Sequence, residues 1–371
     1  MLTVNKIIKR NTLFCRCNFL KTHYGFLEKA SSDEELHYSL AYGILVHQNI
    51  DQVFYMLSAI YQPQNVYCIA VDGKATQTFW TSINYLKSCL PNITIIKVPV
   101  VKWCTYSVLH GVHTCLKNLS KSPYEWQYYQ YLSNIDLPLR TNREMVRIFK
   151  KLNGSINAEV LKFQPFRLLG SKRPVPYNSS LSATFSRKSA NFFANSDEAN
   201  AILRFLKSTY CPDESFWLTV AGNPKILDVA MPGNFDGMKF LTMINNVAKQ
   251  RRNSFYKDRS QKVYYISRYQ LWLHGRRKCH GKWKRASCVF GVQDIRNLIN
   301  QPHLVAHKFL LSVQPAAFFC IYKLVRERSL RDISDFNDGP YGNLPGPRIT
   351  RGESVRNWFY DFHDNKSWYR Y

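Results

Sequence analysis

The amino-acid sequence predicts an α/β fold in which helices cover both faces of a mostly parallel sheet. In the first half of the chain, short runs rich in β-branched and aromatic residues alternate with segments of helical periodicity. This alternation is typical of parallel strands joined by helical crossovers. The chain has 371 residues, of which 45% are hydrophobic and 15% aromatic. Such a composition supports a sizeable core and excludes a disordered or collagenous chain.

The elements of the first half follow from their own patterns. Strands are expected where apolar and β-branched residues cluster, at 42–46, 66–71, 92–98 and 128–132. Helices are expected between them, at 50–60, in a stretch that ends at Cys89, and at 105–119. The segment 136–142 then opens another helix, for which Thr141 or Asn142 is the expected N-cap.

The second half has weaker periodicity. Residues 153–181 are rich in Gly, Pro and Ser and are expected to form a loop. Helices are expected at 196–208, 212–221 and 293–300, and strands at 262–273 and 286–290. From Asp332 onward, repeated Gly and Pro residues indicate an irregular tail.

Polar and aromatic residues follow several of the expected strands. His47 and Asp72 come at or just past the ends of the first two strands, and Trp103 follows the third. Ligands of open α/β sheets bind beyond the carboxyl ends of the strands. The three residues are therefore candidate ligand contacts, with ordinary loop residues or a core aromatic as the alternative.

The segment Pro212-Asp213-Glu214 is the strongest candidate for catalysis. Pro212 suits the first turn of a helix, where its missing N–H is not needed. A carboxylate held there against Phe216 and Trp217 can act as a general base on a substrate hydroxyl. The alternative is a helix start whose acidic residues only favour the helix dipole.

The charge of the chain points to an anionic partner. Its 51 basic and 25 acidic residues give a formal charge of +26, which suits nucleic acid, a phosphorylated ligand or a membrane surface. Residues 249–285 are rich in basic and aromatic residues but carry no nucleic-acid motif, so a solvated basic face is the alternative. The chain has no Asp-x-Asp pair to hold a divalent metal on a nucleotide diphosphate. Cations such as Arg285, at a strand start, and Lys308, beyond a helix, would have to neutralise one instead.

The ten cysteines favour disulfides and an oxidising compartment. No Cys-x2-Cys pair exists, and Cys279-His280 with Cys288 could supply only half of a metal site. Five Asn-x-Ser/Thr sequons agree with a lumenal location. Residues 1–14 do not resemble a signal peptide or an anchor, and the apolar stretch 309–322 is too short to span a bilayer.

Several ordered blocks of sequence together resemble the core 2/I-branching β-1,6-N-acetylglucosaminyltransferases, and nematode members in particular. The matching blocks cover roughly residues 15–325 and include Cys17, 31–35, 40–42, 46–47, 61–72, 136–142, 212–214, 288–291 and 306–309. The resemblance implies a GT-A-type, Rossmann-like fold and an inverting enzyme that requires no metal.

The resemblance also implies roles for individual residues. Glu214 matches the family's catalytic base, which removes the proton from the acceptor's 6-hydroxyl group. Arg285 and Lys308 match the cations that bind the diphosphate. The uridine-side contacts match Leu45, His47 and Asp72, and Trp103 stands where the family has a tyrosine.

The family's disulfides match Cys17–Cys89, Cys68–Cys115 and Cys279–Cys288. Cys15 is the expected mate of Cys320, whose family partner lies in the stem. Cys104 and Cys211 have no family counterparts, but both lie near proposed site segments and could bridge each other. The chain departs from the family around 160–180 and 269–272, where the residues that bind the acceptor find no clear match.

The sequence therefore predicts a glycosyltransferase that moves N-acetylglucosamine (GlcNAc) from UDP-GlcNAc to a glycan or glycoprotein, without a metal, a cofactor or nucleic acid. The expected location is the Golgi lumen, with a type II anchor that is not visible in this chain. The expected division is a stem-like segment at 1–38, a catalytic domain at 39–328 and an irregular tail at 329–371. The alternatives are a catalytically silent lumenal relative that binds glycans or nucleotides, a xylosyltransferase, and a cytosolic nucleic-acid binder inferred from charge alone.

Overall fold

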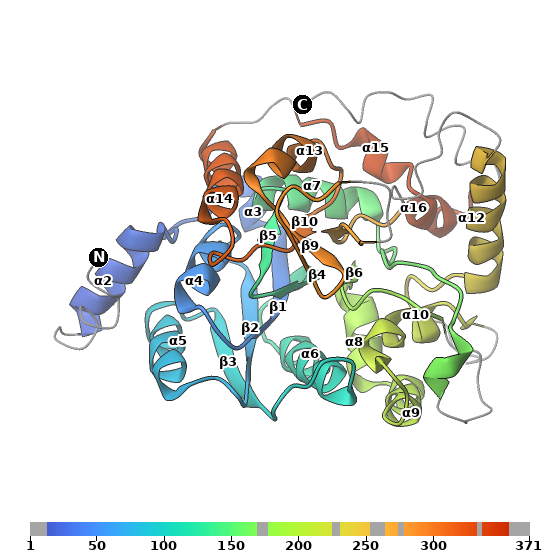
Figure 1. Ribbon diagram of the computed structural model, residues 1–371, viewed down its shortest axis with the longest axis horizontal. Coiled ribbons are helices and arrows are strands. Elements are labelled where there is room, and N and C mark those ends of the chain that lie inside the picture. The colour runs from blue at the N-terminus through green and yellow to red at the C-terminus, as the bar shows by residue number, and fades with distance from the viewer. Residues whose placement is uncertain are drawn as a thin grey trace.

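The structure is a computed structural model that describes residues 13–168, 177–224, 231–252, 264–273, 278–331 and 336–355. Its centre is a five-stranded sheet in the order β3-β2-β1-β4-β6 (Figure 1). The strands are β1 (Ser39–Val46), β2 (Val66–Asp72), β3 (Ile93–Val98), β4 (Trp126–Ser133) and β6 (Thr184–Ser186). The first four are parallel and β6 is antiparallel to β4, so the predicted α/β fold with a mostly parallel sheet is confirmed.

Two apolar clusters pack on the two faces of this sheet. Alternate side chains of β1 and β2 enter different clusters, as the two-residue repeat of a strand requires: Tyr42 and Ile69 belong to one, Ala41 and Cys68 to the other. The first cluster contains residues of α4 (Ile50–Ser58), α5 (Gln77–Cys89), α7 (Asn142–Leu152) and α14 (Pro315–Leu330). The second contains residues of α6 (Tyr106–Ser120), α8 (Arg187–Asn195), α9 (Asp197–Leu206) and α10 (Phe216–Ala221). Helices thus cover both faces.

Smaller elements complete the fold. A three-stranded sheet has the order β5-β10-β7, and β8 pairs with β9 in an antiparallel hairpin. These strands are β5 (Asp136–Pro138), β7 (Tyr269–Gln270), β8 (Lys282–Lys284), β9 (Ser287–Val289) and β10 (Val305–His307). The remaining helices are α2 (Leu13–Tyr24), α3 (Asp33–Leu36), η1 (Pro165–Leu168), η2 (Pro212–Glu214), α12 (Gly237–Arg252), η3 (Val292–Asp294), α13 (Ile295–Ile299), α15 (Gly339–Gly342) and α16 (Pro345–Thr350). No helix in the described part of the chain is both long and apolar enough to cross a bilayer.

The predicted strand at 262–273 is wrong over most of its described length. Only Tyr269 and Gln270 pair as a strand, while residues 262–263 lie outside the described residues. The side chain of Asn157 replaces a neighbouring strand for the residues before them. Its Oδ1 accepts hydrogen bonds from the backbone N–H groups of Ile266 and Ser267, so this buried backbone is satisfied without a β-ladder.

Four disulfides connect distant parts of the chain. They join Cys17 to Cys89, Cys68 to Cys115, Cys104 to Cys211 and Cys279 to Cys288. All three pairs implied by the family resemblance are confirmed, as is the bridge between the two cysteines without family counterparts.

The expected bond between Cys15 and Cys320 is not formed, and both residues are exposed. Helix α2 is oriented by Cys17, whose disulfide fastens it to the end of α5. Residues two apart on an α-helix point about 200° away from each other. Cys15 therefore faces away from the side of α2 that packs against the domain.

Thr141 begins α7 with a capping box, which decides between the two predicted N-caps. The Thr141 hydroxyl accepts from the backbone N–H of Glu144, and the Glu144 carboxylate accepts from the backbone N–H of Thr141. Both side chains are buried. This reciprocal pair satisfies two helix-end donors in a place that water does not reach.

Replacing Thr141 with Ala should therefore lower the free energy of unfolding by about 1–2 kcal/mol, the upper part of the range for N-cap loss. Denaturant titration of the purified protein measures this loss. The matched control is Thr81→Ala, which removes an exposed hydroxyl within α5. Equal effects of the two substitutions would show that the capping box does not stabilise the fold.

Candidate active site

The carboxyl ends of β1 and β2 carry the first group of candidate residues. Leu45 lies near the end of β1, half-buried His47 follows that strand, and buried Asp72 is the last residue of β2. The Oδ1 atom of Asp72 accepts hydrogen bonds from the backbone N–H groups of Lys74 and Val101, each at 3.0 Å. The end of β2 is thereby tied to the loop that follows β3.

The charges at this edge of the sheet fix the protonation of both side chains. Burial opposes ionisation of Asp72, but the hydrogen bonds from Lys74 and Val101 lower the pKa of its carboxyl group. The Lys74 ammonium also forms an ion pair with Asp72, with 2.8 Å between Nζ and Oδ2. Burial and then the charge of Lys74 lower the pKa of His47, and the charge of Arg285 adds to this shift. Asp72 is therefore ionised and His47 neutral at physiological pH.

The loop after β3 connects this edge to the Pro-Asp-Glu segment. Exposed Trp103 precedes Cys104, and the disulfide to Cys211 spans 107 residues of sequence. The backbone N–H of Cys211 also donates to the carbonyl of Cys104. Because Cys211 directly precedes η2, these bonds bring Glu214 to the same side of the sheet as Asp72.

The predicted helix at 212–221 is divided in two, with η2 followed by α10. Pro212 occupies the first turn, as expected, and the Glu214 side chain is about one-third exposed. Phe216 and Trp217 are fully buried in the cluster shared with α8 and α9. Their burial anchors the turn, while the Glu214 carboxylate stays partly open to solvent.

Arg167, at the end of η1, is a site residue that sequence reasoning missed. Its Nη2 atom lies 2.7 Å from Oε2 of Glu214, and its Nε donates to the side chain of Gln164. The buried guanidinium therefore holds the carboxylate in one orientation. Arg167 lies in a segment expected to be loop, and no motif distinguished it from the other basic residues.

Asp213 lies beside this pair in a different environment. Burial and then the negative charge of Glu214 raise the pKa of its carboxyl group to about 7, against the opposing charges of Arg167 and Arg268. Its Oδ1 atom is buried and has no hydrogen-bond partner among the described residues. The two acidic residues of the Pro-Asp-Glu segment thus differ in exposure and in partners.

The two predicted phosphate-binding cations lie close enough to influence each other. Exposed Arg285 occupies the turn between β8 and β9, and buried Lys308 follows β10. The sequence placed Lys308 beyond a helix, and this was wrong: Lys308 directly follows strand β10. Its Nζ donates to the carbonyl of Lys284, 2.6 Å away, which ties the ammonium to the β8–β9 hairpin.

Burial lowers the pKa of the Lys308 ammonium to about 8. The neighbouring charges of Lys284, Arg285 and Arg268 add to the shift. Because Arg285 also lowers the pKa of His47, its positive charge acts on both Lys308 and the end of β1. These basic side chains form a region of concentrated positive charge at the edge of the sheet.

Arg268 acts on both the cations and the Pro-Asp-Glu turn, and it was also missed. Its Nη2 donates to the Ser180 hydroxyl at 3.1 Å, and its charge acts on the carboxyl group of Asp213 and on Lys308. The negative charge of buried Asp136 raises the pKa of Arg268 against the effect of burial. A lone arginine within the apolar stretch 264–273 was the signal that could have identified it.

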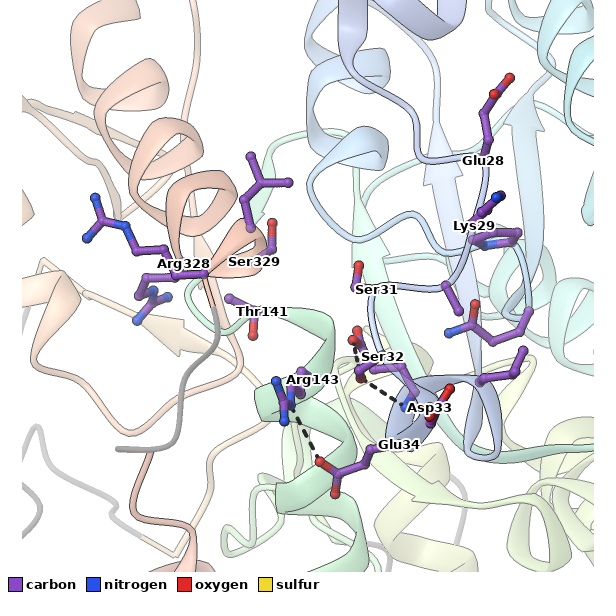
Figure 2. A pocket seen from close by; sticks show the side chains of 17 residues that line it. Glu28, Lys29, Ser31, Ser32, Asp33, Glu34, Thr141, Arg143, Arg328 and Ser329 are labelled. Carbon is purple, nitrogen blue, oxygen red and sulfur yellow. Dashed lines mark hydrogen bonds and ion pairs between the residues drawn. The ribbon is translucent and has the colours of Figure 1, made fainter.

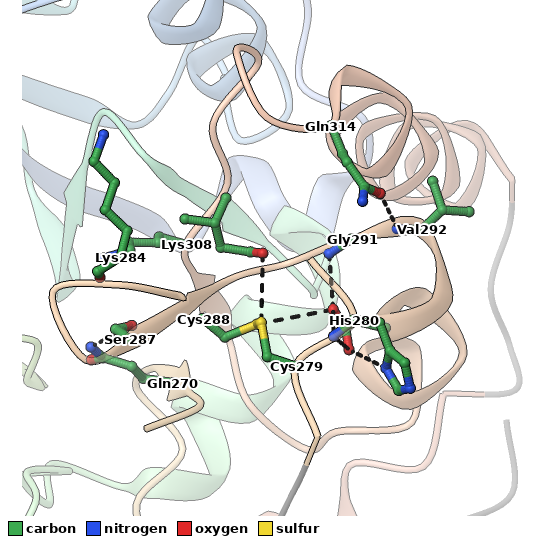
Figure 3. The surroundings of a disulfide bond; sticks show 12 residues. Gln270, Cys279, His280, Lys284, Ser287, Cys288, Gly291, Val292, Lys308 and Gln314 are labelled. Atoms are coloured by element: carbon green, nitrogen blue, oxygen red, sulfur yellow. Dashed lines mark hydrogen bonds and ion pairs between the residues drawn. A yellow bond between two sulfur atoms is a disulfide. The ribbon is translucent and has the colours of Figure 1, made fainter. Parts of the chain in front are cut away.

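Cys279, His280 and Cys288, which the sequence offered as half of a metal site, have a structural role instead. Cys279 and Cys288 approach Asp294 closely, but the two sulfurs form a disulfide (Figure 3), so neither is a thiolate ligand. Asp294 accepts instead from the Gly291 backbone and from Nδ1 of His280. The group fastens the β8–β9 hairpin, whose turn carries Arg285.

A surface cavity of about 1170 Å³ lies away from all of these residues. It is lined by the segment before β1, the start of α7 and the end of α14 (Figure 2). Ser31, Arg143 and Arg328 are among its residues. The cavity is at the amino ends of the parallel strands, whereas His47 and Asp72 are at the carboxyl ends, so its size does not identify it as the active site.

Comparison with known proteins assigns the chain to a family. A model of the core-2/I-branching enzyme matches residues 40–168. The mouse N-acetyllactosaminide β-1,6-N-acetylglucosaminyl-transferase is 30% identical, over 88% of this chain and 82% of its own length. The chain belongs to the core-2/I-branching enzyme family. Its prediction as a glycosyltransferase is therefore confirmed.

Other members of the core-2/I-branching family match at similar levels. The rat β-1,3-galactosyl-O-glycosyl-glycoprotein β-1,6-N-acetylglucosaminyltransferase 3 is 27% identical, over 85% of this chain and 74% of its own. The β-1,3-galactosyl-O-glycosyl-glycoprotein β-1,6-N-acetylglucosaminyltransferase 4 of Danio rerio is 29% identical, over 81% of this chain and 72% of its own. Residues 40–168 contain the uridine-side candidates and Arg167, whereas Glu214, Arg285 and Lys308 lie beyond that range.

Proposed function

We propose that this chain transfers GlcNAc from UDP-GlcNAc to the 6-hydroxyl group of a glycan and forms a β-1,6 branch. In this proposal Glu214 removes the proton of that hydroxyl. The names of the mouse and rat relatives describe β-1,6-N-acetylglucosaminyl transfer, to N-acetyllactosaminide in one case and to an O-glycosyl glycoprotein in the other. A glycan or glycoprotein acceptor and a nucleotide-sugar donor agree with both. The observation that carries the proposal is that Asp72 and Glu214, from distant segments, lie on one side of the sheet, connected through the Cys104–Cys211 disulfide.

The donor site in this proposal follows the edge of the sheet. Leu45, His47, Asp72 and Trp103 hold the uridine end. Neutral His47 and ionised Asp72 provide hydrogen-bonding groups there, and the indole provides a flat apolar surface. The diphosphate extends from this end toward the hairpin turn.

Arg285 and Lys308 neutralise the diphosphate without a metal in this proposal. When the bond between the sugar and the diphosphate breaks, negative charge develops on the leaving UDP. A guanidinium and an ammonium placed there stabilise that charge more in the transition state than in the bound donor, which accelerates the reaction. Lys308 suits this task because it is already buried and held by Lys284.

Glu214 acts as the general base. Its carboxylate accepts the proton of the acceptor's 6-hydroxyl as that oxygen bonds to the anomeric carbon and the bond to UDP breaks. Attack comes from the face opposite the leaving group, so a single displacement inverts the anomeric centre. Arg167 positions the carboxylate through its 2.7 Å ion pair and leaves the other oxygen, Oε1, for the substrate.

The disulfides agree with an oxidising compartment, and we place the reaction in the Golgi lumen. Four disulfides join segments on both sides of the sheet, and cytosolic proteins rarely keep such bonds. A type II membrane anchor is part of the same proposal.

One observation favours a second candidate function, a relative that binds UDP or glycans without transfer. The Oε2 atom of Glu214 is occupied by the Arg167 guanidinium, so only one of its two carboxylate oxygens remains for an acceptor hydroxyl. UDP binding without turnover on a broad panel of acceptors and UDP-sugars would support this second function. The same panel of donors separates an acetylglucosaminyltransferase from a xylosyltransferase.

Replacing Glu214 with Gln should reduce kcat for transfer by about 10²–10⁴-fold, the usual contribution of a general base. UDP affinity should stay within about twofold, because the amide keeps the shape of the side chain. Steady-state transfer assays and calorimetric titration with UDP measure the two effects. Glu125→Gln, at an exposed glutamate, is the matched control and should retain activity. Full transfer by the Glu214→Gln variant would exclude this residue as the base.

The charge of Lys308 predicts how donor use depends on pH. Its pKa of about 8 in the free protein means that the ammonium is present below pH 8 and is lost as the pH rises through that value. The kcat/KM for UDP-GlcNAc should therefore fall above about pH 8, by up to tenfold per pH unit. Lys308→Arg should remove this fall, because a guanidinium stays charged. An unchanged alkaline limb in Lys308→Arg would assign it to another group.

A further inference from the structure

Three exposed aromatic side chains lie together next to the Pro-Asp-Glu turn, η2. Trp103 and Phe166 each expose 65% of their surface, and Tyr210 exposes 40%. The ring of Tyr210 lies between the other two, with its centroid 6.4 Å from that of Trp103 and 6.3 Å from that of Phe166. Single exposed aromatics are common, but a contiguous group of them marks an interaction site.

The fold holds these rings in place through neighbouring residues. The backbone N–H of Tyr210 donates to the carbonyl of Arg167, the residue after Phe166. On the other side, the Cys104–Cys211 disulfide joins the residue after Trp103 to the residue after Tyr210. Each ring is therefore fixed by a bond only one residue away, although the three come from distant parts of the sequence.

This aromatic group is continuous with the candidate base. The Arg167 guanidinium lies 5.9 Å from the centre of the Phe166 ring and 2.7 Å from the Glu214 carboxylate. Tyr210 precedes Glu214 by four residues. A molecule that delivers a hydroxyl to Glu214 from solvent can therefore rest against Phe166 and Tyr210.

The order of the rings separates the two substrates. Trp103 is on the donor side, because its loop is held to Asp72 through the backbone of Val101. Tyr210 packs against Trp103 and Phe166 packs against Tyr210, and the Arg167 guanidinium beside Phe166 pairs with Glu214. With the nucleotide at the end of β2, these two rings remain for the acceptor.

The chemistry of the two rings fits a neutral sugar. The electron-rich face of an aromatic ring attracts the weakly positive C–H groups on the flat side of a pyranose, and the sugar hydroxyls stay in water. Exposed rings held in a fixed geometry lose little entropy when they bind. The Arg167 guanidinium beside Phe166 is already paired with Glu214, which favours a neutral acceptor over a charged one.

We propose that Phe166 and Tyr210 form a subsite for a sugar ring of the acceptor glycan, beside the sugar that carries the reacting hydroxyl. This inference rests on the proposed glycosyltransferase function and adds to it the residues that select the acceptor.

Steady-state kinetics of Phe166→Ala and Tyr210→Ala test the subsite with two acceptors, methyl β-galactoside and a tetrasaccharide of two N-acetyllactosamine units. The KM for the tetrasaccharide should rise about 5–50-fold in each variant, because the sugar next to the reacting one loses its stacking surface, whereas the KM for methyl β-galactoside should not change. The KM for UDP-GlcNAc and the rate of its hydrolysis without acceptor should not change. Tyr124→Ala, at a tyrosine that is also exposed, should leave every parameter unchanged.

An unchanged tetrasaccharide KM in both folded variants would overturn the subsite. An equal rise in the donor KM would also overturn it, because the rings would then belong to the nucleotide site. Calorimetric titration with the tetrasaccharide separates this failure from that of the proposed function. If the wild-type chain transfers nothing, weaker tetrasaccharide binding by Phe166→Ala still supports the subsite, whereas equal binding by both proteins overturns it.

Discussion

The candidate site depends on the tie between the end of β2 and the Pro-Asp-Glu turn. Asp72 holds the backbone of Val101, and three residues later Cys104 is bonded to Cys211. Without these two links, the loop after β3 and the turn before α10 would be separate surface segments. The links are of different kinds, a buried charge-assisted hydrogen bond and a covalent bond, and both constrain backbone near exposed side chains. A site that must exclude water and orient two substrates needs such rigid support.

The second organising feature is the distribution of charge. Acidic groups lie on the Pro-Asp-Glu turn, and basic groups lie on the β8–β9 hairpin and just after β10, while the charge of Arg268 acts on both. Burial shifts the two extremes in opposite senses: it raises the pKa of Asp213 to about 7 and lowers that of Lys308 to about 8. Both shifts arise because a partly dehydrated site disfavours charge. A diphosphate bound near Lys308 would restore the favoured partner of that ammonium, so donor binding and lysine protonation support each other.

The sequence predicted the first half of the fold well because β1 and β2 are buried on both faces and read as nearly continuous apolar runs. The ends of the predicted strands then pointed to His47 and Asp72 as candidate ligand contacts. The rest depended on contacts between distant residues. Asn157 replaces a strand partner through its side chain, which no local pattern reveals. Helices α8 and α12 were not anticipated, and Arg167 could be distinguished from the other basic residues only by the carboxylate it contacts. Cys104 and Cys211 were paired because both lay near proposed site segments.

The central claim is that protein cations, and not a divalent metal, neutralise the leaving diphosphate. Calorimetric titration of UDP and of uridine into the chain, in the presence of EDTA, tests it most directly. The account predicts that UDP binds more tightly than uridine by at least about tenfold, and that replacing Lys308 with Ala removes most of that advantage. Equal affinities for UDP and uridine in EDTA, with a preference for UDP only after a divalent metal is added, would contradict the account.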